Sequence, residues 1–71
     1  MSFAEEWKKK NKRTVFAQDL KNDEVYEANP QSAIADIRSH FAESAEAAEV
    51  RLLQSDMEHP IYINGTEFWV E

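Results

Sequence analysis

The chain has 71 residues, a net charge of −6 and no cysteine. This length predicts a single domain, residues 1–71, near the lower limit for a self-sufficient hydrophobic core. Disulfide staples are excluded, and a structural zinc site is disfavoured because the chain has only two histidines. The fold must therefore rely on close packing, to which six Phe and Trp side chains contribute.

The sequence also bears on location. No apolar stretch is long enough to span a bilayer. The first residues do not show the positive charge followed by an apolar run that is typical of a secretory signal. We therefore expect a cytoplasmic protein that does not bind membranes.

Residues 2–12 are predicted to form a short helix. Ser2 suits the N-cap, and Glu5 then completes a capping box. The acidic residues come first and the lysines last, as the helix dipole favours. Phe3 and Trp7 share one face, but the remainder is polar, so we expect this helix to cover the fold without being a core element.

Residues 14–28 are predicted to form a β-hairpin. Strand-forming residues lie at both ends of this segment, and a polar, turn-like cluster spans residues 21–24. The alternation of apolar and polar residues is too weak to set the register of the hairpin.

Residues 30–54 are predicted to form one long helix. Asn29 suits an N-cap, and Pro30 suits the first helical position. Apolar residues then recur at helical spacing up to Leu52. The competing interpretation ends the helix near Phe41 and makes residues 48–54 a strand. We favour the continuous helix, because residues 42–49 are rich in the good helix formers Ala and Glu.

Residues 60–70 carry the clearest signal, a hairpin turning at Asn64-Gly65. In the resulting register Ile61 opposes Phe68, and these two residues share the core face with their apolar neighbours. The opposite face carries the remaining side chains: Tyr62, Glu67, Trp69 and Glu71. The whole chain therefore predicts an α+β fold, with a long helix packed on a small, mostly antiparallel four-stranded sheet of two hairpins, and a short N-terminal helix.

Catalytic and cofactor motifs are not found. The sequence has no Gly-rich phosphate loop, nucleophile elbow or paired-carboxylate motif, so we expect neither an enzyme nor a cofactor. Asp36 and His40 are four residues apart, which we interpret as a surface pair and not as a catalytic or metal-binding pair. Asp56, Glu58 and His59 are interpreted as a polar loop without a metal.

Tyr62 and Trp69 on the non-core face of the second hairpin need an explanation. The N-terminal helix can cover them, so that Phe3 and Trp7 complete a second small core. Alternatively the two aromatics form a partner-binding surface, since Trp and Tyr dominate interface hot spots. Homodimerisation through this face or an edge strand is the third alternative.

Charge is unevenly distributed. Residues 1–13 carry a net charge of +3, whereas residues 14–71 carry −9. The acidic part repels nucleic acid and favours basic partners. Our leading hypothesis is a small acidic protein-interaction module that acts by stoichiometric binding. It would serve as an inhibitor or adaptor, such as a phage or bacterial accessory protein, that competes with nucleic acid for a basic site.

Two groups of residues are candidates for binding this protein partner. The first is on the second hairpin: Tyr62, Glu67 and Trp69. The second is an acidic strip on the exposed side of the long helix: Asp36, Glu43, Glu46 and Glu49.

The alternative hypothesis is direct nucleic-acid binding through the basic segment of residues 8–13. Its candidate contacts to phosphate are the five cations Lys8, Lys9, Lys10, Lys12 and Arg13. The twelve acidic residues downstream oppose a close approach to a duplex, and no aromatic residue within the segment offers stacking.

Overall fold

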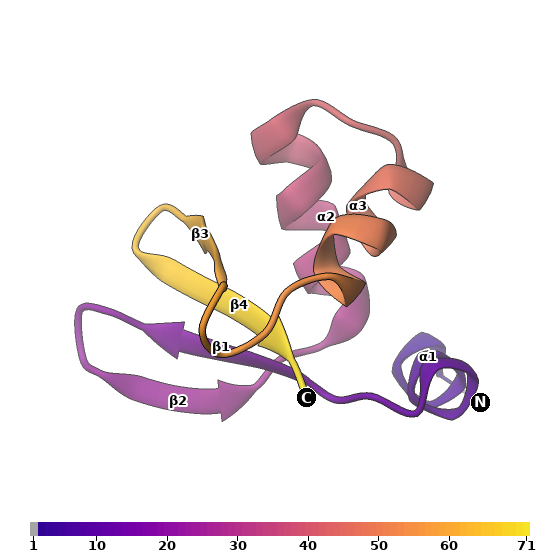
Figure 1. The fold of residues 1–71 in the computed structure, drawn as a ribbon, viewed down its shortest axis with the longest axis horizontal. Coiled ribbons are helices and arrows are strands. Elements are labelled where there is room, and N and C mark those ends of the chain that lie inside the picture. The colour runs from indigo at the N-terminus through magenta and orange to yellow at the C-terminus, as the bar shows by residue number, and fades with distance from the viewer. Residues whose placement is uncertain (1) are drawn as a thin grey trace.

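The computed structural model describes residues 2–71 and has three helices and one antiparallel four-stranded sheet over this range (Figure 1). The elements are α1 (Phe3–Asn11), β1 (Val15–Asp19), β2 (Glu24–Glu27), α2 (Pro30–Phe41), α3 (Ala45–Leu53), β3 (Ile61–Ile63) and β4 (Thr66–Val70). The predicted α+β class, with two hairpins and a short first helix, is confirmed.

The prediction of a single helix over residues 30–54 was wrong. Helix α2 ends at Phe41, because Ala42 adopts a left-handed conformation with φ 52° and ψ 47°. Ser44 then caps α3 by accepting a hydrogen bond from the backbone N–H of Ala47 at 3.1 Å. The competing interpretation placed the helix end near Phe41 correctly, but residues 45–53 form a helix and not a strand.

Side chains hold the corner between α2 and α3. The Arg51 guanidinium donates two hydrogen bonds to the Glu43 carboxylate, at 2.7 and 3.0 Å, and lies 4.0 Å from the centre of the Phe41 ring. The corner folds α3 back beside α2, so Ile37 and Leu52 both stay buried. The two helices therefore bury most of the apolar stripe that was assigned to one helix, but Phe41 and Ala45, on either side of the break, are exposed.

The central pair of the sheet joins the two ends of the chain. The strand order is β2-β1-β4-β3, so β1 pairs with β4 between the two hairpins. Thr14 and Glu71 extend this pairing through two backbone hydrogen bonds of 3.0 Å each. At the opposite end the Leu20 N–H donates to the Gly65 carbonyl at 3.0 Å.

The turn of the second hairpin is as predicted. Asn64 and Gly65 both have positive φ, at 48° and 84°. Ile61 lies opposite Phe68, and Tyr62 opposite Glu67. Ile61 and Phe68 are buried, which confirms the core face assigned from the register.

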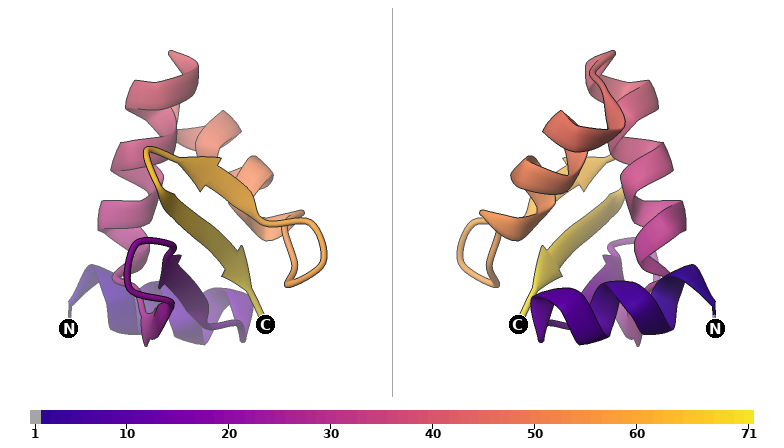
Figure 2. Two further views of the ribbon diagram at one scale, coloured as in Figure 1. Left: turned by 90° about the vertical axis from the view of Figure 1, so that its left-hand side faces the viewer. Right: turned by 90° about the vertical axis from the view of Figure 1, so that its right-hand side faces the viewer.

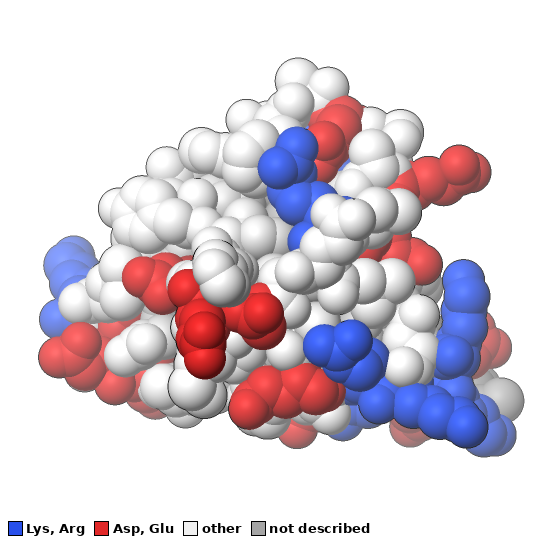
Figure 3. Space-filling model, viewed as in Figure 1, with Lys and Arg blue, Asp and Glu red and all other residues white. Residues whose placement is uncertain are grey.

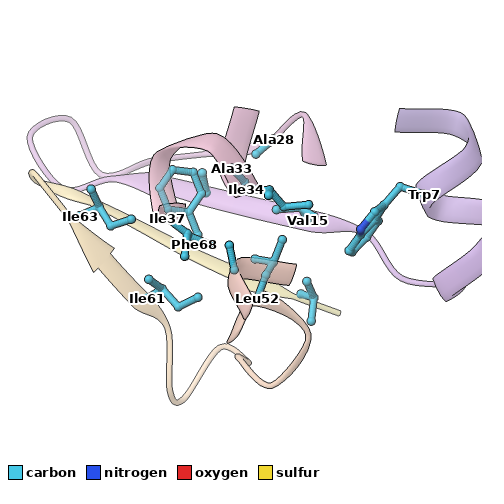
Figure 4. Packing of buried hydrophobic residues seen from close by; sticks show 13 residues of the cluster. Trp7, Val15, Ala28, Ala33, Ile34, Ile37, Leu52, Ile61, Ile63 and Phe68 are labelled. Carbon is cyan, nitrogen blue, oxygen red and sulfur yellow. The ribbon is translucent and has the colours of Figure 1, made fainter. Parts of the chain in front are cut away.

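The hydrophobic core lies between the sheet and the helices. Figure 2 shows α2 and α3 on one side of the sheet, with α1 crosswise near the end where β1 begins. Ile37, Leu52 and Phe68 bring α2, α3 and β4 together in this core (Figure 4). Trp7 of α1 belongs to the same cluster and is 3% exposed. The expectation that α1 only covers the fold was therefore wrong, because its single tryptophan reaches into the core.

Candidate interaction surface

The face of the sheet opposite α2 and α3 is the main candidate surface, and we call it the open face. Its residues follow from the registers of the three strand pairs, because directly opposed side chains point to the same side. The open face comprises Phe16, Gln18, Val25, Glu27, Tyr62, Glu67 and Trp69.

Trp69 lies on the open face but is only 4% exposed. Its ring stacks on Phe16 of the neighbouring strand, with centroids 6.2 Å apart and an angle of 26° between the planes. The buried indole nitrogen has no hydrogen-bond partner among the described residues. Trp69, which we predicted as a partner contact, therefore serves first as packing between the central strands.

The second core under α1, one of the three alternatives for Tyr62 and Trp69, is not formed. Trp7 packs in the main cluster, to which Trp69 does not belong, and Phe3 is 43% exposed. The aromatic ring that stacks on Trp69 is that of Phe16 on β1. The sheet itself thus supplies a neighbour for Trp69 that the sequence pattern did not identify.

Tyr62 and Val25 are the accessible apolar side chains of the open face. They lie on the two outer strands of the sheet: Tyr62 is 58% exposed on β3, and Val25 is 54% exposed on β2. Glu67 lies directly opposite Tyr62, and Glu27 lies two residues after Val25 on the same face. The open face therefore combines exposed apolar groups with carboxylates.

The predicted acidic strip is divided among three places. Asp36 of α2 lines a pocket of about 240 Å³ beside the second hairpin, together with His40 and Asn64. Glu46 and Glu49 of α3 line a different groove, between the three helices. Glu43 lies at the helix corner, bound to Arg51. The four acidic residues do not form one continuous strip, because the helix breaks between Asp36 and Glu46.

The Glu43–Arg51 pair changes the acidity of the carboxylate. The hydrogen bonds from Arg51 lower the pKa of Glu43 below its ordinary value. The same bonds raise the pKa of Arg51. Glu43 is thus a structural partner of Arg51, which leaves it poorly suited to bind a second cation.

Basic side chains gather around α1 (Figure 3). Lys8 forms an ion pair with Glu27 of β2. The Nζ atom of Lys10 lies 3.7 Å from Oε1 of Glu49 on α3. Arg13 donates to the Val70 carbonyl at 3.5 Å. Three of the five candidate phosphate contacts therefore have partners within the protein, and they attach α1 to the body.

The loop before β3 is organised by Asp56. Its carboxylate accepts hydrogen bonds from the backbone N–H groups of Glu58 and His59, at 2.9 and 2.7 Å, and lies 3.1 Å from Nδ1 of His59. The hydrogen bond from the His59 backbone is the main reason that the pKa of Asp56 is lowered. Within residues 2–71, no three His, Asp or Glu side chains are grouped so as to hold a metal ion.

The sequence raised an edge strand only as a route to homodimerisation, and it did not identify β2 as the exposed edge. All four residues of β2 are exposed, among them Tyr26 at 46%. Strand-type residues in this segment predicted a hairpin, but the pattern did not show which strand would lie outermost. That position depends on the pairing of β1 with β4, which joins residues far apart in the sequence.

Comparison of the chain with protein-family models, curated proteins and solved structures gives no match. In the part of the chain that the structure describes, no helix combines the length and apolar character required to cross a membrane. Any functional proposal therefore rests on the chemistry of the surfaces described above.

Proposed function

We propose that this protein is a small acidic interaction module that acts by stoichiometric binding to a basic protein, as an inhibitor or adaptor. The observation that carries the proposal is the open face, where Tyr62 is 58% exposed next to Glu67. Tyrosine is enriched at interface hot spots, and carboxylates around it select positively charged partners. Phe16 and Trp69 support this face from within the sheet.

A finer form of the proposal is competition with nucleic acid for a basic site on the partner. Its support is the net charge of −9 over residues 14–71. The pairs Lys8–Glu27 and Lys10–Glu49 direct part of the basic segment toward the protein's own carboxylates. This arrangement favours a basic protein partner over direct nucleic-acid binding, because phosphate would have to displace these carboxylates.

The experiment is affinity capture with the tagged chain, followed by native mass spectrometry and titration of the purified complex. We expect a basic partner in a defined stoichiometric ratio, with an affinity that falls as salt concentration rises. Tyr62→Ala should weaken binding at least tenfold, whereas Val50→Ala should leave it unchanged. Val50 is the matched control, since it is 53% exposed but lies on α3, away from the open face.

The competing outcomes are equally definite. A complex that resists salt, or that is weakened by Val50→Ala but not by Tyr62→Ala, would contradict the open face as the binding surface. In a mobility-shift titration at low salt, we expect no complex between the protein and duplex or single-stranded nucleic acid. A complex that is lost when the lysines of α1 are neutralised would favour the nucleic-acid alternative.

A further inference from the structure

Within residues 2–71, the outer strand β2 has one strand neighbour. It pairs with β1 and occupies one end of the strand order, so its other edge is free. Its residues Glu24, Val25, Tyr26 and Glu27 are all exposed. Such an edge is a template for pairing with another chain.

Two residues of β2 present their backbone groups to this free edge. The Ala28 N–H donates to the Val15 carbonyl at 2.9 Å, which makes this pair a hydrogen-bonded one. Hydrogen-bonded and non-hydrogen-bonded pairs alternate along an antiparallel ladder. Tyr26, opposite Ala17, therefore points its N–H and C=O toward β1, while Val25 and Glu27 point theirs away from it.

The other edge strand is different. Strand β3 has only three residues, Ile61–Ile63, and contacts α2. Two of its three side chains are buried. The β2 edge is thus the longer and less covered of the two, and it carries two exposed apolar side chains, Val25 and Tyr26.

We propose that the β2 edge binds an extended segment of a partner protein as a fifth strand. This inference rests on the proposed function and names the mode of binding. The segment carries a Lys or Arg opposite Glu24 and apolar residues opposite Val25 and Tyr26. Its backbone bonds to the N–H and C=O groups of Val25 and Glu27.

Charge decides which occupant fits this edge. Pairing β2 with β2 of a second copy would gather the carboxylates of Glu24 and Glu27 from each copy on one short ladder, with Lys8 beside Glu27 as the cation on each side. This excess of negative charge opposes pairing, so the edge disfavours its own copy. A basic segment is complementary to it. The chain's own Lys8 already forms an ion pair with Glu27, which shows that a cation fits beside this strand.

To test the proposal, the synthetic peptide acetyl-Thr-Lys-Ile-Val-Lys-Thr-amide is titrated into the full chain. The amide resonances of the protein are followed by NMR. The matched control peptide has both lysines replaced by glutamate. We expect the basic peptide to shift the amide resonances of β2 and to protect the N–H groups of Val25 and Glu27 from exchange. Added salt should weaken the effect, and the acidic peptide should have none.

Val25→Pro provides the decisive variant. Proline removes an N–H that makes no bond to β1, so the sheet should keep its spectrum while peptide binding falls at least tenfold. Tyr26→Pro removes an N–H that points toward β1 and should disrupt the first hairpin instead. A second test leaves the protein unchanged: N-methylation of the peptide's valine, which faces Val25, should abolish binding, whereas N-methylation of its isoleucine should not.

Several results would overturn the inference. These are equal shifts with the acidic peptide, shifts centred on β3 or on the helices, no shifts at low salt, or binding that survives Val25→Pro. The proposed function can be separated from this inference. If Tyr62→Ala abolishes binding of the captured partner but Val25→Pro does not, the interaction module stands and the fifth strand is wrong.

Discussion

The two hairpins of this protein have the same topology but different surroundings. The C-terminal hairpin turns in two residues at Asn64-Gly65, and its outer strand β3 buries Ile61 and Ile63. The N-terminal hairpin has a longer turn, and no residue of its outer strand β2 is buried. The difference arises because α2 contacts β3, whereas β2 lies at the opposite end of the sheet.

The comparison shows that a strand's own residues do not decide its burial. Tyr26 and Ile61 both lie on the core face of an outer strand, yet Tyr26 is 46% exposed and Ile61 only 9%. One hairpin therefore stabilises the fold through both of its strands. The other contributes β1 to the core and leaves β2 available to a partner.

The largest expected effect on stability is at the β1–β4 pair, which joins the two hairpins. Trp69→Ala removes the ring that stacks on Phe16 and should lower the free energy of unfolding by about 3–5 kcal/mol. Tyr62→Ala on the same face should change it by less than about 0.5 kcal/mol, since that side chain is exposed. Urea denaturation followed by circular dichroism measures both. Similar values for the two variants would mean that the open face does not divide into a packed centre and an accessible rim.

The outer strands give the next effect. Ile61→Ala should cost about 2–5 kcal/mol, because it leaves a cavity under the helices. Val25→Ala should cost no more than about 0.5 kcal/mol, because its side chain is mostly in water. The same denaturation assay compares the two. A large loss for Val25→Ala would show that β2 is covered in solution and would remove the contrast between the hairpins.

The two turns provide a smaller contrast. Gly65→Ala should cost about 1–2 kcal/mol, because φ is 84° there and an added Cβ meets no atom within 4 Å, so only backbone strain acts. Asp23 in the other turn has φ 54°. Asp23→Gly should relieve backbone strain in the folded state, but it also raises the conformational entropy of the unfolded chain, which opposes folding. We therefore expect Asp23→Gly to change stability by less than about 1 kcal/mol. Thermal unfolding of both variants tests this difference, and a reversed order would contradict it.

The smallest effect concerns acid pH and the corner between α2 and α3. Arg51 lowers the pKa of folded Glu43 below the unfolded value, so the pair stabilises the fold above that value. This stabilisation is lost as pH falls through the lowered pKa. The melting temperature of the protein should therefore exceed that of Glu43→Gln near neutral pH. The gap should close below the ordinary glutamate pKa of about 4.3. A gap that stays constant throughout the acid range would mean that the ion pair contributes nothing.

Local sequence signals located most of the elements. Ser2 and Asn29 cap their helices as their residue types predict, and the Asn64-Gly65 turn sets the register that buries Phe68. The break at Ala42 was missed, because alanine is a strong helix former and its left-handed conformation has no local signature. Arg51 reaches Glu43 across that break, and such a contact becomes visible only after the chain has turned.

The candidate site was predicted in part. Tyr62 and Glu67 lie on the face assigned from the register, and Tyr62 is accessible. Trp69 lies on that face too, but it is buried beside Phe16, whose strand was not known to be its neighbour. The strip from Asp36 to Glu49 depended on a continuous helix and does not exist as one surface.

The sequence by itself determined the features that depend on neighbouring residues: the α+β class, the helix caps, the tight turn and the alternation of the second hairpin. Contacts between distant residues were decided only by the tertiary structure. The pairing of β1 with β4 brought Phe16 to Trp69 and left β2 at an edge. Trp7 entered the core because α1 packs against α2. The physical reason is that caps and turns are satisfied within a few residues, whereas burial depends on which surfaces meet after the chain has closed on itself.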